Sequence, residues 1–243
     1  MKVKQTLLAT LPALALFSQS TLANMSVYPM EINVDASGAG QIKVSSKSDD
    51  IQFIRIKKKK IINPGTPQEK EIDVTSINEG ALVVTPEKFA LAAGSMRVVR
   101  LVSLMPEKKE TAWRVYFEGV NQPDDPAEEN GLPAGNAQAK VGVNIIWGAL
   151  VHLAPESASV ALSINTAKGT VFNSGTLRVP LKEIGICNAD SKCKWVEEHA
   201  TVYPDTERQL KALNNMARGS HYKYRYFDWL ERTTKEAEFH VVN

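Results

Sequence analysis

KVGVNIIWGALVHLAP, residues 140–155, is the longest strand-like stretch of the sequence, and it decides the fold. Val141, Val143 and Ile145 occupy alternate positions, so a strand would place three branched apolar side chains on one face. Any half-buried strand shows such alternation, so the pattern alone favours an ordinary core strand over a strand that binds a partner. Pro155 interrupts the run and is the expected hinge between two domains.

Similar short segments, rich in Val, Ile, Tyr and Phe, recur on both sides of this stretch between clusters of Gly, Pro, Asn and Asp. Helical periodicity is almost absent, and the pattern therefore predicts an all-β protein made of sandwiches. The strands expected before the hinge are residues 27–34, 41–45, 52–60, 71–74, 81–85, 96–104, 112–120 and 139–153. Eight strands suit one immunoglobulin-like domain, and a second set of short strands is expected over 159–242.

Two segments do not fit a strand. Residues 121–138 are rich in proline, glycine and acidic residues and are predicted to form a long loop. Residues 207–218 are compatible with either a short helix or a polar loop. We therefore expect a first domain over residues 24–154 and a second over 155–243.

The N-terminus has the three-part layout of a secretory signal peptide over residues 1–23. Lys2 and Lys4 precede the apolar residues 7–17, and small residues follow up to Ala23. The apolar run is too short to cross a bilayer of about 30 Å, so we expect an exported protein without membrane insertion.

Charge argues against nucleic acid as a partner. The sequence has 29 Lys and Arg and 27 Asp and Glu, and loss of Lys2 and Lys4 with the signal peptide would leave 27 of each. A neutral chain lacks the basic excess that nucleic acid or an anionic membrane surface attracts.

The two cysteines, Cys187 and Cys193, stand six positions apart between strand-like segments. In an oxidising compartment this spacing predicts a disulfide that closes a hairpin-like turn. Two cysteines without a nearby histidine are too few for a structural zinc site, which takes four protein ligands.

No catalytic constellation occurs in the sequence. It contains no HExxH zinc motif, no GxSxG nucleophile elbow and no glycine-rich phosphate loop. The four histidines have no metal-binding spacing: His152, His199, His221 and His240. We expect a protein that is not an enzyme and needs no metal or cofactor.

Residues 57–60 form a run of four lysines inside a strand-like segment. Charged residues of this kind protect an edge strand from aggregation. A strand would place Lys58 and Lys60 on the face opposite Lys57 and Lys59, so a role in binding an acidic partner stays open.

Four segments together resemble the periplasmic chaperones of colonisation-factor-type (alpha-class) fimbriae, which are related to the P-pilus chaperones. They are KKIINPGTPQEKEIDV (59–74), ALVVTPEKFALAAGSMRVVRLVSL (81–104), KKETAWRVYFEGV (108–120) and KVGVNIIWGALVHLAP (140–155). The resemblance covers residues 27–155 and is weaker beyond, where YRYFD and the cysteine pair carry it.

The resemblance implies two immunoglobulin-like domains arranged as a boomerang or L, with a binding cleft between them. It also implies a periplasmic chaperone that caps major and minor fimbrial subunits by donating its G-strand to each incomplete sheet. An outer-membrane usher-type assembly protein would then receive the subunit. The donor residues carried over from the family are Val141, Val143 and Ile145.

The family also suggests charged residues that fix the angle between the domains, here Arg100, Glu110 and Asp228. The family's two basic residues that hold the subunit's terminal carboxylate fall at Glu31 and Leu150, so that anchor is missing. Arg114 is the first replacement candidate, because a guanidinium binds carboxylates through two parallel hydrogen bonds, and Lys58 is the second. An outward-pointing, solvated arginine is an equally good description of Arg114.

The main alternative is a fimbrial structural subunit or tip adhesin, which would also be exported and all-β. Against it, the first expected strand begins close to the signal cleavage site, and the last strand of the first domain is complete. Whether the free protein caps its own open edges as a homodimer is left undecided by the sequence.

Overall fold

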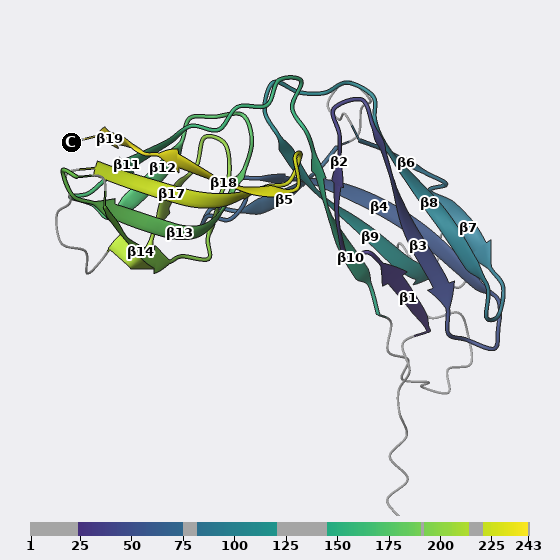
Figure 1. The fold of residues 1–243 in the computed structure, drawn as a ribbon. Helices are drawn as coiled ribbons and strands as arrows, with labels where there is room; N and C mark the ends of the chain where they lie inside the picture. Colours follow the sequence, from purple (N-terminus) through teal and green to yellow (C-terminus); the bar gives the residue numbers. More distant parts are fainter. Residues whose placement is uncertain (1–23, 75–81, 121–144, 191, 214–220, 243) are drawn as a thin grey trace, which may run out of the picture.

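The computed structural model describes residues 24–74, 82–120, 145–190, 192–213 and 221–242, and nearly all of its regular structure is β (Figure 1). Two sandwiches meet at an angle, with the first in purple to teal and the second in green to yellow. The signal peptide, the 121–138 loop, Val141 and Val143 lie outside the described residues.

The first sandwich packs one sheet of order β1-β3-β8-β6 against a larger one of order β2-β10-β9-β4-β5, with β7 paired to β4. Its strands are β1 (Met25–Tyr28), β2 (Glu31–Val34), β3 (Ala39–Ser46), β4 (Gln52–Ile62), β5 (Lys70–Asp73), β6 (Leu82–Thr85), β7 (Lys88–Leu91), β8 (Met96–Ser103), β9 (Thr111–Val120) and β10 (Trp147–Leu153). Alternate apolar residues of the two sheets fill the space between them, as Ile42, Val99 and Phe117 do.

The strand expected over 27–34 is two strands that belong to different sheets. β1 runs antiparallel to β3, whereas β2 runs parallel to β10. Pro29 lies between them and has no N–H for a ladder, so a break at this point is physically reasonable. β7 was not predicted from the sequence, and the strand expected over 139–153 is β10 within the described residues, starting only at Trp147.

The second sandwich packs a sheet of order β16-β12-β11-β19 against one of order β14-β13-β17-β18, with β15 paired to β13. Its strands are β11 (Leu162–Asn165), β12 (Thr170–Asn173), β13 (Val179–Cys187), β14 (Cys193–Glu197), β15 (Thr201–Val202), β16 (Glu207–Gln209), β17 (His221–Asp228), β18 (Thr233–Glu238) and β19 (His240–Val242). The segment left undecided at 207–218 begins with β16 and continues as a short 3₁₀ helix, Lys211–Leu213.

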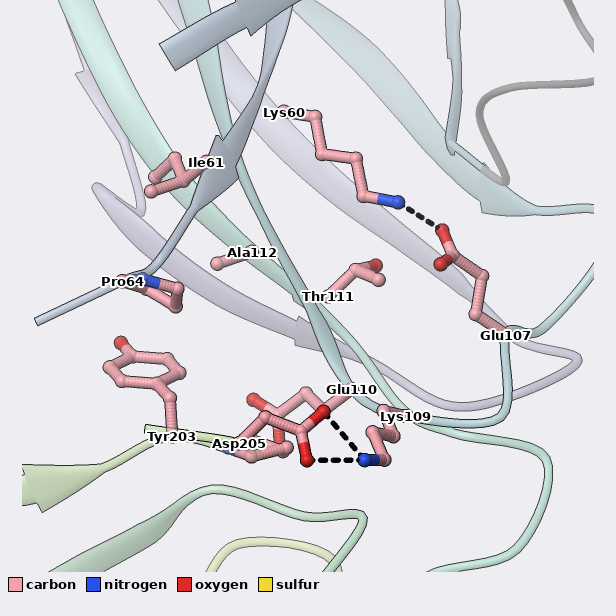
Figure 2. A pocket seen from close by; sticks show the side chains of 11 residues that line it. Lys60, Ile61, Pro64, Glu107, Lys109, Glu110, Thr111, Ala112, Tyr203 and Asp205 are labelled. Carbon is pink, nitrogen blue, oxygen red and sulfur yellow. Dashed lines mark hydrogen bonds and ion pairs between the residues drawn. The ribbon is translucent and has the colours of Figure 1, made fainter. Parts of the chain in front are cut away.

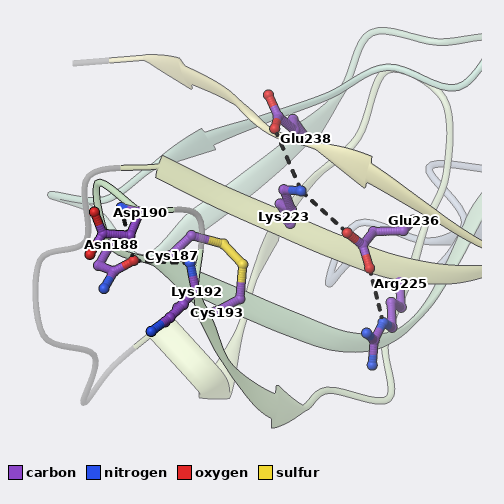
Figure 3. Close-up of a disulfide and its surroundings, with 9 residues drawn as sticks. All are labelled: Cys187, Asn188, Asp190, Lys192, Cys193, Lys223, Arg225, Glu236 and Glu238. Carbon is purple, nitrogen blue, oxygen red and sulfur yellow. Dashed lines mark hydrogen bonds and ion pairs between the residues drawn. A yellow bond between two sulfur atoms is a disulfide. The ribbon is translucent and has the colours of Figure 1, made fainter.

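The predicted disulfide between Cys187 and Cys193 is confirmed. The two residues are direct partners in the β13–β14 ladder, so the bond joins adjacent strands beside the turn (Figure 3). This places the covalent link at one end of the second sandwich.

A small apolar cluster connects the two main cores. Ala154, Leu177 and Trp229 form its buried part, and Ala36 of the first sandwich packs against it. The chain passes through this cluster at Ala154, next to the expected hinge Pro155. The domain bounds 24–154 and 155–243 stay a proposal that agrees with these separate cores.

Candidate functional site

The larger sheet of the first sandwich has one face in the core and one face outside. Trp113, Val115 and Phe117 of β9 point into the core and are each 0% exposed. Arg114 and Tyr116 alternate with them and therefore lie on the outer face. The end of this face that is nearest the second domain is covered, because Ala112 is buried there.

Arg114 lies in the middle of a row of side chains that crosses the outer face. Its ladder partners are Leu150 on β10 and Lys59 on β4. Leu150 is in turn paired with Glu31 on β2. The structure thus brings Arg114 directly beside Leu150 and two strands from Glu31, the two positions at which the family's missing anchor was expected.

Glu71 of β5 connects Arg114 to Tyr116. Its Oε1 lies 3.5 Å from Nε of Arg114, and its Oε2 accepts a 2.6 Å hydrogen bond from the Tyr116 hydroxyl. Burial, then the hydrogen bond to Glu71, raises the pKa of Tyr116. The tyrosine hydroxyl therefore stays protonated at neutral pH and acts as the hydrogen-bond donor to Glu71.

Gly148 of β10 provides the space in which these two side chains lie. A Cβ at this position would come within 3.1 Å of Cδ of Arg114 and 3.1 Å of Cε1 of Tyr116. A larger residue would therefore require both side chains to shift by a few tenths of an ångström. Arg114 was predicted from the sequence as a site residue, whereas Tyr116, Glu71 and Gly148 were not.

A second polar cluster lies between the domains, around the buried carboxylate of Glu110. The backbone N–H of Arg178 donates to its Oε2 at 2.9 Å, and the Arg178 guanidinium binds its Oε1. Nε1 of Trp229 also approaches Oε2, at 3.4 Å. Arg178 additionally donates to Oδ1 of Asn33 at 2.7 Å, so one side chain of the second domain holds two of the first.

His152 of β10 is buried between two carboxylates. Its Nδ1 is 3.3 Å from Oε1 of Glu110, not aligned as a hydrogen bond, and its Nε2 is 3.4 Å from Oε1 of Glu31. Burial acts to raise the pKa of Glu110, but the approach of His152 and the charge of Arg178 outweigh burial and lower it. The approach of His152 likewise lowers the pKa of Glu31.

No family model matches the chain. The chain is 35% identical over 201 residues to an Escherichia coli protein named as a fimbrial subunit of CFA/I, covering 80% of this chain and 83% of that protein. It superposes on the crystal structure of the class 5 fimbriae chaperone CfaA with a TM-score of 0.71 and 31% identity, covering 89% of this chain and 99% of that one. The chain belongs to the class 5 fimbrial chaperones.

A chain of the CFA/I chaperone–tip adhesin complex matches this chaperone with a TM-score of 0.70 and 29% identity, again over 89% of this chain and 99% of the other. The resemblance found in the sequence is thereby confirmed, as is the all-β fold of two immunoglobulin-like domains. The E. coli relative is named as a subunit, whereas the solved structure of similar identity, matched over nearly its whole length, is a chaperone.

The structure does not place Lys58 of the chaperone beside Arg114. Lys58 lies on the same face of β4 as the buried Ile54 and Ile56, and its Nζ donates to the carbonyl oxygen of Leu82 on β6 at 2.7 Å. Its ammonium is thus directed between the two sheets of the first sandwich, away from the outer face. The basic residue next to Arg114 is Lys59, whose Nζ is 3.4 Å from Asp73.

The predicted interdomain set of Arg100, Glu110 and Asp228 is wrong in two of its three members. Arg100 is exposed on β8, in the smaller sheet, where its ladder partners are Gln41 and Thr85. No ion pair with Glu110 is formed there. The arginine that pairs with Glu110 is Arg178, between β12 and β13.

Asp228 serves the turn that follows β17. Its Oδ1 accepts hydrogen bonds from the backbone N–H groups of Leu230 and Glu231, and its Oδ2 is 2.8 Å from Nζ of Lys235. The adjacent residue, Trp229, is the one that reaches Glu110. Asp228 therefore stabilises the turn next to Trp229 and does not itself contact Glu110.

Of the three expected donor residues, only Ile145 lies among the described residues. It is 41% exposed and Ile146 is 51% exposed, immediately before β10 begins. Two large apolar side chains thus face solvent at the start of the strand that also carries Gly148 and Leu150. The donor role of Val141, Val143 and Ile145 stays a prediction.

A cavity of about 180 Å³ lies at the junction of the domains (Figure 2). Both of its lysines are paired: Lys60 with Glu107, and Lys109 with both oxygens of Asp205 in the second domain. The ion pair between Lys109 and Asp205 is therefore a further charged link between the domains, and neither lysine that lines the cavity is unpaired.

Within the described ranges, no group of three or more His, Cys, Asp and Glu side chains is arranged to hold a metal ion. In the same part of the chain, no helix is long and apolar enough to span a bilayer.

Proposed function

We propose that this chaperone works in the periplasm, where it binds major and minor fimbrial subunits by donor-strand complementation and passes them to an outer-membrane usher-type assembly protein. The donor strand is β10 together with the residues before it, including Val141, Val143 and Ile145. The work involves no catalysis and no cofactor. The complex with a tip adhesin formed by its CFA/I relative supports a fimbrial protein as the partner.

The observation that carries the proposal is the composition of β10 and its surroundings. Exposed apolar residues precede the strand, at Ile145 and Ile146, and Arg114 lies beside Leu150 farther along it. β2 pairs with β10 only from Leu150 onward, so a subunit strand could be added to the edge of β10 before that residue. Such a strand would meet the exposed apolar residues at one end and the guanidinium of Arg114 near the other. Burying three branched donor side chains would contribute about 5 to 8 kcal/mol before ordering costs.

Export and the disulfide agree with this placement. A signal peptide over residues 1–23 would direct the chain out of the cytoplasm. The Cys187–Cys193 bond is of a kind that persists in oxidising compartments such as the periplasm.

The donor assignment is tested by Val143→Asp. A charge placed in the apolar groove of a subunit would cost several kcal/mol, while the free chaperone should fold normally because the proposed role of Val143 is to contact the subunit and not the chaperone's own core. The candidate subunits are the exported proteins encoded beside the chaperone. The measurement is the amount of each of them that co-purifies with the chaperone from periplasm. Unchanged recovery with Val143→Asp would refute the donor role.

The anchor assignment is tested by Arg114→Ala in the same assay. We expect loss of subunit capture with little loss of chaperone stability, because truncating one partner of a desolvated charge pair typically costs about 2 to 5 kcal/mol of binding. Arg114→Lys should restore capture only in part, since lysine lacks the planar fork. Lys58→Ala is the control. Full capture by Arg114→Ala would refute the assignment.

The alternative, a fimbrial subunit or tip adhesin, predicts a different behaviour. A chaperone should be soluble when purified alone, as a monomer or as a homodimer that covers its own open edges. With a subunit it should form a one-to-one complex. A subunit purified alone should aggregate through its open sheet edge.

A further inference from the structure

The contacts among Arg114, Glu71 and Tyr116 leave one edge of the guanidinium open. Glu71 meets Arg114 only at Nε, through Oε1 at 3.5 Å. Its other oxygen is taken by the Tyr116 hydroxyl at 2.6 Å. Among the described residues, no hydrogen bond or ion pair reaches either Nη atom of Arg114.

This arrangement differs from the one a free arginine and glutamate prefer. A carboxylate and a guanidinium favour two parallel N–H to O bonds, with both oxygens engaged. Glu71 is prevented from forming that pair because Oε2 is bound to Tyr116. The side chain that prevents it is the tyrosine.

We propose that Tyr116 holds Glu71 to one side so that the Nη edge of Arg114 stays available for the terminal carboxylate of a bound chain. This inference rests on the proposed anchoring role of Arg114. Tyr116 is then a positioning residue, and it decides between an external carboxylate and the internal one. Without it, Glu71 would turn both oxygens to the guanidinium and occupy the site from within.

If Tyr116 no longer held Glu71, the Glu71 carboxylate would compete with the subunit's terminal carboxylate for Arg114 and would have a strong advantage. A tethered carboxylate acts at an effective concentration in the millimolar range or above, whereas a subunit's terminus must compete from solution. The hydroxyl is suited to its task because burial and Glu71 raise the pKa of Tyr116, so it remains a donor.

The surroundings of the three side chains are compatible with this arrangement. Gly148 leaves the surface of β10 open, and Arg114 and Tyr116 lie across it. The β4–β5 hairpin that carries Glu71 is held by the second domain, since Arg208 donates to the carbonyl oxygen of Gly65 at 3.3 Å. Arg114 and Glu71 are 30% and 28% exposed, which leaves room for a ligand at the edge.

The test uses the full-length mature chaperone and two fluorescent peptides of about ten residues, a length typical of a long strand, alternating valine and threonine. One peptide ends in a free carboxylate and the other in an amide. Binding is measured by fluorescence anisotropy for the wild type, Tyr116→Phe, Glu71→Gln, the double variant and Arg114→Ala. Glu118→Gln is the matched control, because that carboxylate pairs with Arg55 and Lys57 on the same strand pair.

We expect the wild type to prefer the free carboxylate. Tyr116→Phe should lose about tenfold in affinity for that peptide and nothing for the amide, as one charge-assisted contact is blocked. Adding Glu71→Gln to Tyr116→Phe should restore the preference, since the internal competitor is gone. Glu71→Gln alone and Glu118→Gln should keep it.

Three outcomes would overturn the role of Tyr116. They are an unchanged preference in Tyr116→Phe, an equal loss for both peptides, and a double variant that is not restored. The anchor itself fails separately: a wild type without preference for the carboxylate, or an Arg114→Ala variant that keeps it, would refute the anchor and this inference together.

Discussion

Replacement of Arg178 by methionine removes the only guanidinium that contacts the buried carboxylate of Glu110 within the described structure. The methionine stem would still pack near Trp229, and the backbone N–H of residue 178 would still donate to Oε2 of Glu110. The lost contacts are the ion pair, the 2.7 Å bond to Asn33 and the cation–π contact 5.0 Å above the Trp229 ring.

The magnitude follows from the burial of the pair. The Glu110 side chain is 0% exposed and that of Arg178 is 5% exposed, and removing one partner of such a pair typically costs about 3 to 5 kcal/mol. Two N–H donors remain at Glu110, so we expect the lower end, about 3 kcal/mol. For a chain of this size that corresponds to a fall in Tm of about 6 to 12 °C.

The assay is urea and thermal unfolding followed by circular dichroism. Arg100→Met is the matched control, because it removes an exposed arginine and should change the free energy of unfolding by less than about 0.5 kcal/mol. Combining Arg178→Met with Glu110→Gln should recover much of the loss, since no buried charge is then unpaired. Equal effects of Arg178→Met and Arg100→Met would refute the reasoning.

Two further predictions concern stability. Replacing Cys187 and Cys193 together by serine should destabilise the second domain by about 2 kcal/mol, by loop-closure arithmetic, without changing peptide binding; two free thiols in the unreduced, unfolded wild type would contradict it. Because the pKa of Glu110 is lowered from 4.5, its carboxylate stabilises the fold above that pH and loses the effect as pH falls through the folded value. The stability difference between wild type and Glu110→Gln should therefore shrink below about pH 4.5, and a difference independent of pH in urea titrations would count against the buried carboxylate.

Much of the fold could be predicted because strand formation leaves a local record. Alternation in β9 separates the buried Trp113 and Val115 from the exposed-face residues Arg114 and Tyr116, and this is visible in WRVYF. Pro29, at which the first strand ends, was visible in the sequence, but two short strands separated by two residues have the pattern of a single strand. β7 was missed because four residues after Pro86 show too little alternation to stand out.

Site residues could be predicted only where the sequence of a single strand indicated them. Arg114 was selected from its own segment, whereas Glu71 reaches it from β5 through strand pairing across β4. Arg178 pairs with Glu110 across 68 positions and two domains, and nothing in the neighbouring sequence marks it. Family likeness placed that role on Arg100 and Asp228, and only side-chain direction and burial correct the choice.

The division of the Glu110 pair between two domains has a consequence for recombination. In a first domain standing alone, the carboxylate would be hydrated and harmless, so the charge costs little until the second domain covers it. Joined to a foreign second domain without an arginine at the place of Arg178, the same carboxylate would be sealed off from water with no cation. Chimaeras of related chaperones should therefore be more stable when Glu110 and Arg178 are inherited together, which makes this pair a check on the identity of the partner domain.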